Sequence, residues 1–142
     1  MATTQTSWLN HVGQWLGTKP RTEFDLANLA ERRLATDVVR VMTARGLTAR
    51  EVYALVIPER TLKHRRSRRE RLSQAESDRA IRAARVLARA QEVLGAGDRA
   101  LGWMREPKRR FGGRTPLEML GTEAGGRLVE EMLTQIDEGI FA

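Results

Sequence analysis

The sequence predicts an all-α protein, and three observations lead to this fold class. Apolar residues recur at steps of three and four along almost the whole chain, and no segment alternates between apolar and polar residues as a strand would. Three Ser/Thr-x-x-Glu motifs, beginning at Thr48, Ser73 and Thr115, can each form the capping box that starts a helix. Glycine or proline follows most of the apolar runs. We therefore expect helices joined by short turns.

The first half of the chain contains four expected helical segments. Near the N-terminus, helically spaced apolar residues predict either a helix packed on the body or an arm that grips a second subunit: Trp8, Leu9, Val12, Trp15 and Leu16. One helix is expected over residues 25–45, ended by a glycine cap. Thr48 starts a short helix that Pro58 ends. A further helix is expected over residues 59–69, with Leu62 turned inward.

The longest expected helix opens at Ser73 and has an apolar side and a basic side. Its apolar stripe consists of Ala80, Ile81, Ala84, Leu87, Ala88 and Leu94, and its basic side carries Arg79, Arg82, Arg85 and Arg89. A shorter helix then ends before Pro107. Residues 108–114 read as a loop, because their glycine pair can adopt backbone angles that other residues avoid.

Two further helices complete the chain. Thr115 can cap a short one, and Thr122 can cap a last one that ends at Gly139. Inside this last helix, Gly125 and Gly126 each cost roughly 1 kcal/mol relative to Ala. The pair therefore indicates either the close approach of another backbone, in this chain or in a dimer mate, or a late start of the helix.

Length and composition limit the classes of function. A chain of 142 residues suits one domain or two small helical subdomains that share a core. It has no Cys and two distant histidines, so it offers no thiolate metal site and no Cys/His or Ser/His/Asp constellation. No apolar run approaches the ~18 residues of a membrane span, and the N-terminus does not resemble a secretory signal. We expect a cytoplasmic protein without enzymatic activity, cofactor or metal ion.

Charge is concentrated in two segments of opposite sign. Residues 60–71 contain seven cations and one anion, a net charge of +6 against +7 for the whole chain. Residues 117–142 contain six acidic residues and one basic residue, a net charge of −5. A basic middle and an acidic end favour two different partners, the first of them polyanionic. The alternative for the basic segment is a solvated cationic face.

Two helices joined by a tight turn, the second of them cationic, form the helix-turn-helix arrangement of DNA-binding proteins. Residues 48–56 would be the supporting helix and residues 59–69 the recognition helix. The side chains expected near base edges are Arg60, Thr61, His64 and Arg65. The other cations are expected to bind phosphates, which gives affinity without sequence information; they are Lys63, Arg66, Arg68, Arg69 and Arg71.

As an ordered set, several motifs resemble the Xre/MbcA/ParS family of antitoxins. In the first half they are Ile57-Pro-Glu-Arg-Thr-Leu62, Arg71-Leu-Ser73, Glu76-Ser-Asp-Arg79 and Ala88-Arg-Ala90. In the second half they are Trp103, Pro107, Gly112-Gly-Arg-Thr-Pro-Leu117, Thr122-Glu-Ala-Gly125 and Gly139. The match runs from about Leu47 onward, and the residues before it match loosely.

The resemblance implies an N-terminal Xre-like helix-turn-helix subdomain and a C-terminal helical toxin-binding domain. We divide the chain into an N-terminal arm or helix at residues 1–24, a DNA-binding region at residues 25–71 and a toxin-binding domain at residues 72–142. The implied partners are a RES-domain toxin, which consumes NAD or transfers ADP-ribose, and operator DNA, through which the antitoxin represses its own operon. A homodimer within a larger toxin–antitoxin complex is also implied.

The toxin-binding residues expected from the resemblance lie in a loop and a tail. They are Gly112, Gly113, Arg114, Thr115 and Pro116, and then Ile140, Phe141 and Ala142. An apolar tail is costly in water unless something covers it, so we expect loop and tail to cover the NAD cleft of the toxin. The alternative is that Phe141 folds back onto its own core.

Two further points stay open. The basic cluster Lys108-Arg-Arg110 departs from the family pattern, and suits either an acidic toxin surface or DNA. The competing function is a stand-alone helix-turn-helix regulator whose C-terminal half only dimerises.

Overall fold

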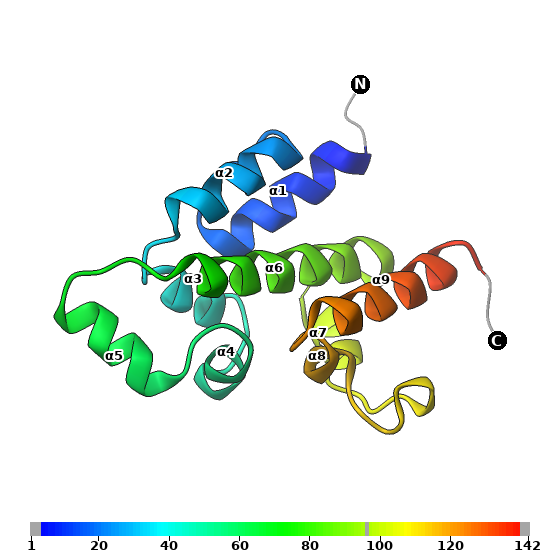
Figure 1. The fold of residues 1–142 in the computed structure, drawn as a ribbon. Helices are drawn as coiled ribbons and strands as arrows, with labels where there is room; N and C mark the ends of the chain where they lie inside the picture. Colours follow the sequence, from blue (N-terminus) through cyan, green and yellow to red (C-terminus); the bar gives the residue numbers. More distant parts are fainter. Residues whose placement is uncertain (1–3, 96, 140–142) are drawn as a thin grey trace.

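The computed structural model describes residues 4–95 and 97–139, and within these residues all regular structure is helical (Figure 1). The α-helices are α1 (Thr4–Leu16), α2 (Glu23–Arg32), α3 (Val38–Ala44), α4 (Ala49–Leu55), α5 (Glu59–Ser67), α6 (Gln74–Leu94), α7 (Asp98–Met104), α8 (Pro116–Met119) and α9 (Glu123–Asp137). A 3-10 turn at Arg109–Phe111 precedes α8. Among the described helices, none combines the length and the hydropathy that crossing a membrane requires. The predicted all-α class is confirmed.

The long helix α6 forms the centre of the fold. Figure 1 shows α1 and α2 on one side of it, α3 and α4 on the other side of its first half, and α7 to α9 near its second half. Small side chains let these neighbours approach closely, since Ala80, Ala84, Ala88 and Ala90 are fully buried in α6. One hydrophobic core therefore extends along α6 and joins the two halves of the chain.

Capping boxes start the helices at the predicted positions. Ser73 Oγ accepts a hydrogen bond from the Glu76 amide at 3.1 Å, and Glu76 Oε1 accepts one from the Ser73 amide at 2.7 Å. The boxes at Thr48 and Thr115 form in the same way. Thr22 forms a fourth box at the start of α2, with Asp25 in the place where the motif has Glu.

The single helix predicted over residues 25–45 is wrong, because the structure has two helices there, α2 and α3, with a break over residues 33–37. The Leu34 amide donates to Ser77 Oγ at 2.9 Å, and the Leu34 carbonyl accepts from the Leu72 amide at 2.9 Å. These bonds to the start of α6 replace the helical bonds of Leu34. Its side chain stays buried, so the apolar periodicity continues across the break and conceals it in the sequence.

The N-terminal segment is a helix packed on the body, the first of the two predicted arrangements. Trp15 is 1% exposed, and its indole Nε1 donates to Gln91 Oε1 at 3.0 Å. Trp8 Nε1 donates to the backbone oxygen of Arg85 at 3.1 Å, and the Arg85 guanidinium lies 4.8 Å from the centre of the Trp8 ring. Both tryptophans therefore fasten α1 to α6.

The close backbone approach indicated by the glycine pair lies within this chain. A Cβ added at Gly125 would overlap the backbone oxygen of Met119 at the end of α8. Gly126 has more room, because its nearest neighbour is the flexible Arg82 side chain at 3.4 Å. Gly125 thus allows α8 and α9 to meet at a sharp corner.

Candidate functional site

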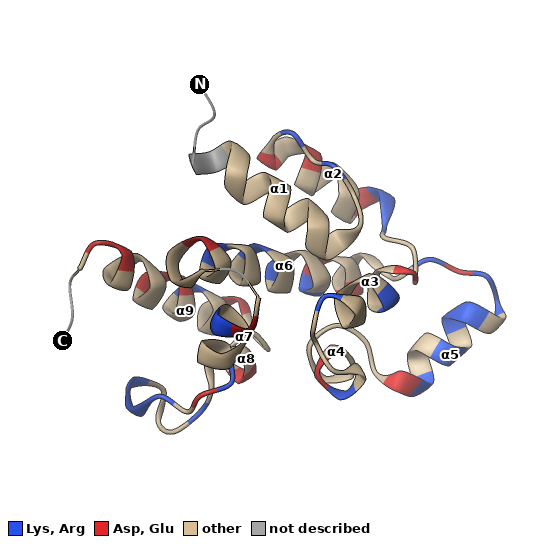
Figure 2. Ribbon diagram, turned by 180° about the vertical axis from the view of Figure 1, so that it is seen from behind, with Lys and Arg blue, Asp and Glu red and all other residues tan. Residues whose placement is uncertain are grey.

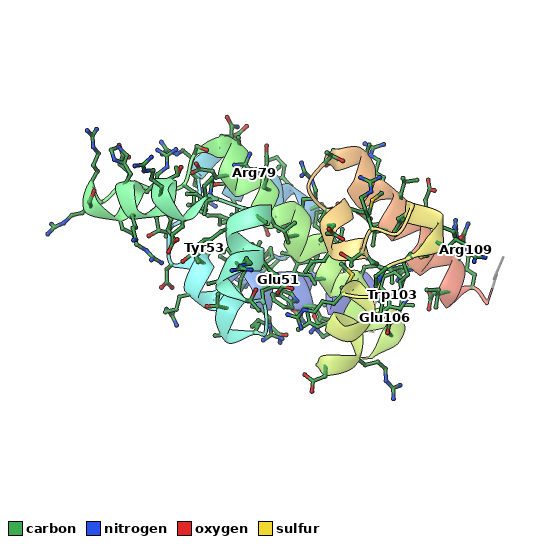
Figure 3. The ribbon with its side chains drawn as sticks, turned by 90° about the horizontal axis from the view of Figure 1, so that it is seen from below. Glu51, Tyr53, Arg79, Trp103, Glu106 and Arg109 are labelled. Carbon is green, nitrogen blue, oxygen red and sulfur yellow. The ribbon has the colours of Figure 1, made fainter. Side chains whose placement is uncertain are left out.

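The helix-turn-helix consists of α4, the turn at residues 56–58, and α5. Val56 and Ile57 are buried in the turn, and Leu62 of α5 is 1% exposed. Arg79 of α6, labelled in Figure 3, donates from Nε to the backbone oxygen of Val56 at 3.0 Å. The turn is therefore fixed to the body from both sides, and α5 projects from it (Figure 1).

The basic residues of α5 are displayed at one end of the molecule (Figure 2). Five of the candidate DNA-binding cations are exposed and form no ion pair with any acid of the described chain: Arg60, Lys63, Arg66, Arg68 and Arg69. His64 is also exposed and Thr61 is half-buried. Three of these cations lie on α5 and two directly after it, and a group of exposed, unpaired cations is suited to binding a phosphate backbone by releasing counterions.

Arg65 differs from its neighbours because it is paired within the chain. Its Nε and Nη2 donate to Glu76 Oε1 and Oε2, both at 3.1 Å, and its Nη1 lies 3.5 Å from Glu70 Oε1. Glu76 is 5% exposed. Burial alone would raise the pKa of Glu76, but hydrogen bonds from Arg65 and from the Ser73 amide outweigh it, and the pKa is lowered. Arg65 thus joins the end of α5 to the start of α6.

The Gly112–Pro116 loop is a compact structure at the opposite end of the molecule from α5. The amides of Phe111 and Gly113 both donate to the Lys108 carbonyl at 3.0 Å, and Phe111 is buried beneath the turn. Gly112 and Gly113 have φ of +66° and +89°, angles that residues with a Cβ rarely adopt. No neighbour restricts the space at either glycine, so the backbone angle is what requires glycine.

The remaining predicted toxin-binding residues of the loop differ in exposure. Arg114 is exposed, and its Nε donates to the Phe111 carbonyl at 3.3 Å. Thr115 is half-buried because its hydroxyl caps α8, and Pro116 is buried at the first position of that helix. Ile140, Phe141 and Ala142 lie outside the described residues.

A hollow that the sequence did not predict lies beside this loop. It has a volume of about 250 Å³, and its lining residues include Arg114, Met119, Ala124 and Leu128. Leu128 is one of two large apolar side chains that are clearly exposed among the described residues, at 46%. Leu128 and the apolar lining of the hollow form one contiguous patch, which makes this a candidate surface for contact with another protein. The helical spacing of the apolar residues at 128, 129, 132, 133 and 136 predicts one buried stripe, and this prediction is wrong for Leu128, which is exposed.

The basic cluster before the glycines is largely engaged in local contacts. Lys108 lies 4.5 Å from the centre of the Trp103 ring and 3.4 Å from Glu106, while Arg110 donates to Gln135 at 2.7 Å. Arg109 is exposed at the tip of the turn. Which partner this cluster faces stays a prediction.

The two surfaces are joined by a contact between the helix-turn-helix and the end of α7. Arg105 Nε and Nη2 donate to Glu51 Oε2 and Oε1 at 2.9 and 2.8 Å, and Nη2 also donates to the Gly46 carbonyl at 2.8 Å. In Figure 3, Glu51 lies between Tyr53 on one side and Trp103 and Glu106 on the other. The hydrogen bonds from Arg105 lower the pKa of Glu51.

The four arginines on the basic side of α6 are half-buried, and each forms a hydrogen bond or ion pair with another part of the chain. Besides the Arg79 bond to the turn, Arg82 pairs with Glu123 at 3.2 Å and Arg89 with Asp137 at 3.4 Å, both on α9. Arg85 pairs with Glu23 on α2 at 2.9 Å. These contacts hold both halves of the chain against α6, and periodicity alone gives no signal for them.

Comparisons with known proteins find two family domains in the chain. The model of the antitoxin Xre-like helix-turn-helix domain matches residues 25–85, which include α4 and α5. The model of the antitoxin Xre/MbcA/ParS C-terminal toxin-binding domain matches residues 89–139, which include the Gly112–Pro116 loop and α9. Both expected domains are thus found, and α6 runs from one into the other.

Two curated relatives carry the name antitoxin Xre. The protein of Pseudomonas putida is 45% identical over 98 residues, which is 69% of this chain and 62% of that protein. The protein of Yersinia enterocolitica is 35% identical over 88 residues, 61% of this chain and 59% of that protein. The chain spans about three fifths of the length of each relative. With both family domains present in order, the chain belongs to the Xre/MbcA/ParS family of antitoxins.

Proposed function

We propose that this chain is the antitoxin of a type II toxin–antitoxin pair, that it neutralises a RES-domain toxin, and that it represses its own operon. The observation that carries the proposal is that two separate surfaces lie in the two matched domains. One is the unpaired cationic helix α5, in the helix-turn-helix match. The other is the loop and hollow beside Leu128, in the toxin-binding match.

The toxin is held inactive by steric exclusion, which requires no chemistry from the antitoxin. The Gly112–Pro116 loop supports this role because its internal hydrogen bonds already hold its shape, so binding orders little additional backbone. Leu128 offers an apolar contact and Arg114 a charged one at the rim of the same hollow. Residues 140–142 supply the apolar tail that covers the NAD cleft.

The operon is repressed through α5. A homodimer presents two copies of this helix to two half-sites of the operator, and the exposed cations supply most of the affinity. Arg60, Thr61 and His64 lie in the first two turns, where side chains reach base edges. The buried Glu76 pair holds Arg65 back against α6, so its role is to fix the angle of α5.

Co-expression with the RES-domain toxin tests the inhibitory role. Leu128→Asp and Arg114→Glu are expected to restore growth arrest, since each places a negative charge on the contact surface. Phe24→Asp is the matched control, because Phe24 is 72% exposed on α2, away from the hollow. Equal neutralisation by Leu128→Asp and Phe24→Asp, both folded by circular dichroism, contradicts the proposed surface.

Deleting residues 139–142 tests the tail separately. The truncated chain should fold with unchanged melting temperature and should fail to neutralise the toxin. Full neutralisation by the truncated chain would show that the tail does not cover the cleft, and the inhibitory surface would then be the loop and hollow alone.

A further inference from the structure

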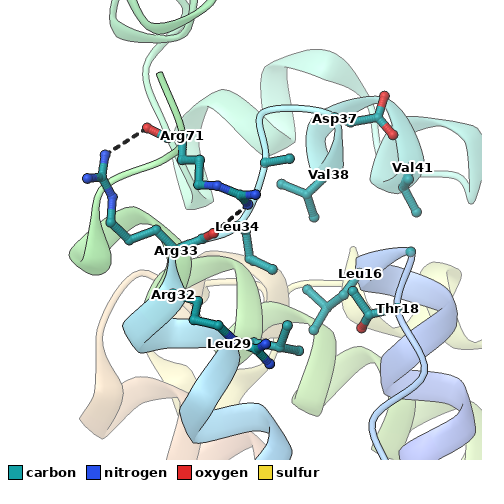
Figure 4. A pocket seen from close by; sticks show the side chains of 12 residues that line it. Leu16, Thr18, Leu29, Arg32, Arg33, Leu34, Asp37, Val38, Val41 and Arg71 are labelled. Atoms are coloured by element: carbon teal, nitrogen blue, oxygen red, sulfur yellow. Dashed lines mark hydrogen bonds between the residues drawn. The ribbon is translucent and has the colours of Figure 1, made fainter. Parts of the chain in front are cut away.

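A cleft with an apolar floor and a cationic rim lies where the ends of α1 and α2 meet the start of α3 (Figure 4). Its volume is about 520 Å³, inside the range of about 300–1,000 Å³ that is usual for small-molecule sites. The floor is formed by Leu16, Leu29, Leu34, Val38 and Val41. Neither α5 nor the Gly112–Pro116 loop lines this cleft, so the proposed function leaves it unused.

Three arginines line the cleft. Figure 4 shows the Arg32 and Arg71 side chains beside it and the Arg33 guanidinium directed away from it, and Arg33 and Arg71 hold each other in place. Arg33 donates from Nη2 to the Arg71 carbonyl at 3.1 Å and from Nε to the Leu72 carbonyl at 2.6 Å. Arg71 returns a bond from Nη1 to the Arg33 carbonyl at 3.0 Å, as the dashed lines in Figure 4 show. The guanidinium groups of Arg33 and Arg71 each keep N–H groups that donate to no acceptor among the described residues. The same holds for Arg32, which is exposed.

The backbone at Arg33 is strained in a way that serves this arrangement. Its φ is +68°, a value that costs a residue with a side chain about 1–3 kcal/mol. Arg33 is one of two residues other than glycine with positive φ in the described chain. Strain of this kind gathers at ligand sites, where it sets the direction of a side chain. Here it brings the Arg33 guanidinium to the segment after α5.

The charge of the rim is not cancelled from within the cleft. Asp37 is the one acid among its lining residues, and its carboxylate is engaged by Arg40 at 2.8 and 2.9 Å. Figure 4 shows the Asp37 side chain directed away from Arg33 and Arg71. An anion that enters therefore meets the guanidinium groups of Arg32 and Arg71 and an acid that is already paired with Arg40.

We propose that this cleft binds a small phosphate-bearing ligand with a flat or aliphatic body, of nucleoside-monophosphate size. The phosphate lies against Arg32 and Arg71, whose planar forks suit its oxygens, while Arg33 holds the Arg71 backbone in place. The body lies on the leucine and valine floor, which a phosphate alone leaves uncovered. A bound phosphate also steadies Arg71, and with it the segment that leads from α5 to α6.

Isothermal titration calorimetry of the full chain with AMP tests this site without toxin or operator. AMP is expected to bind, while adenosine and inorganic phosphate each bind at least about tenfold more weakly, because each lacks half of the contacts. Ala35→Phe fills the cleft from an exposed position and should abolish AMP binding with every arginine retained. Arg71→Gln should weaken it at least about fivefold, and Arg21→Gln, which removes an exposed cation outside the cleft, should not change it.

Two results overturn the proposal. One is AMP binding that persists unchanged in Ala35→Phe, which places the nucleotide elsewhere. The other is the absence of AMP binding at millimolar concentration. If Arg32→Gln and Arg71→Gln then weaken binding to operator DNA, the phosphate that this rim recognises belongs to the DNA backbone and no small ligand is bound. None of these results bears on the antitoxin proposal, which co-expression with the toxin tests separately.

Discussion

Arg105 and Glu51 form a two-point ion pair that joins the end of α7 to the first helix of the helix-turn-helix. Glu51 also accepts a hydrogen bond from the Thr48 amide at 2.8 Å, so the same carboxylate caps α4 and receives Arg105. The toxin-binding half of the chain is thereby connected to the DNA-binding half through one side chain.

Stability should fall in acid through this pair. The Arg105 hydrogen bonds lower the pKa of Glu51, so the stabilisation is fully present above the ordinary glutamate pKa of about 4.3 and is lost as pH falls through the lowered value. Arg105→Ala should cost about 1 kcal/mol at pH 7 and less at pH 3. Urea unfolding at the two pH values measures the difference. An equal cost at both would mean that Arg105 acts through packing alone.

Arg65 and Arg66 should behave differently although they are neighbours in one basic run. Arg65→Ala leaves the buried Glu76 carboxylate without its main partner and should cost about 1–3 kcal/mol. Arg66→Ala removes an exposed cation and should change stability by less than about 0.5 kcal/mol. Thermal unfolding of the two variants measures the contrast, and equal losses would contradict the assigned roles.

DNA binding provides a second test of the same pair. Glu76→Gln removes a negative charge, which by long-range electrostatics alone should strengthen DNA binding. We expect it to weaken binding as Arg65→Ala does, because α5 loses its fixed angle. Arg66→Ala with Arg69→Ala should weaken binding to all sequences and reduce the slope of log K against log salt by about two. Mobility shifts at several salt concentrations report both effects.

The glycine pair of α9 offers a matched comparison. Gly125→Ala should destabilise the fold by about 1–3 kcal/mol, since its Cβ overlaps the Met119 carbonyl. Gly126→Ala should be neutral or stabilising by up to about 1 kcal/mol, because the Cβ fits beside Arg82 and alanine favours the helix. Chemical unfolding of both variants decides the matter. Equal effects would mean that the corner between α8 and α9 relaxes freely.

Replacing Glu130 on α9 with an uncharged residue should stabilise the folded protein at neutral pH. Burial raises the pKa of its carboxyl group above the ordinary value, with Arg85 acting in the opposite direction. The ionised form is therefore less favourable in the folded protein than in the unfolded chain at neutral pH. Glu130→Gln should raise the melting temperature at pH 7 and have a smaller effect at pH 4. A lower melting temperature at pH 7 would contradict this.

Local signals predicted most of the fold. The capping boxes at Thr48, Ser73 and Thr115 mark helix starts because their hydrogen bonds join residues three apart. The break between α2 and α3 could not be predicted in this way. It depends on Leu72 and Ser77, which lie about forty positions after Leu34 in the chain and reach it only in the folded protein.

For the candidate surfaces too, the sequence identified the segments but not the contacts that form only in the folded protein. The basic run identifies α5 as the cationic helix, but its cations look alike in sequence, and the Glu76 contact is what sets Arg65 apart. The Gly112–Gly113 pair identifies a tight loop because the backbone angles require glycine. The hollow beside Leu128 is formed by α8 and α9 meeting at a corner, which no spacing within one helix reveals.

One separation-of-function measurement tests the central claim most directly. Toxin neutralisation and operator binding are measured on the same preparations of two full-length variants, Leu128→Asp and the double variant Arg66→Ala with Arg69→Ala. We predict that Leu128→Asp loses neutralisation and keeps DNA binding, and that the double variant shows the reverse. Loss of both activities in either variant, with the fold intact, would contradict the assignment of the two activities to separate surfaces.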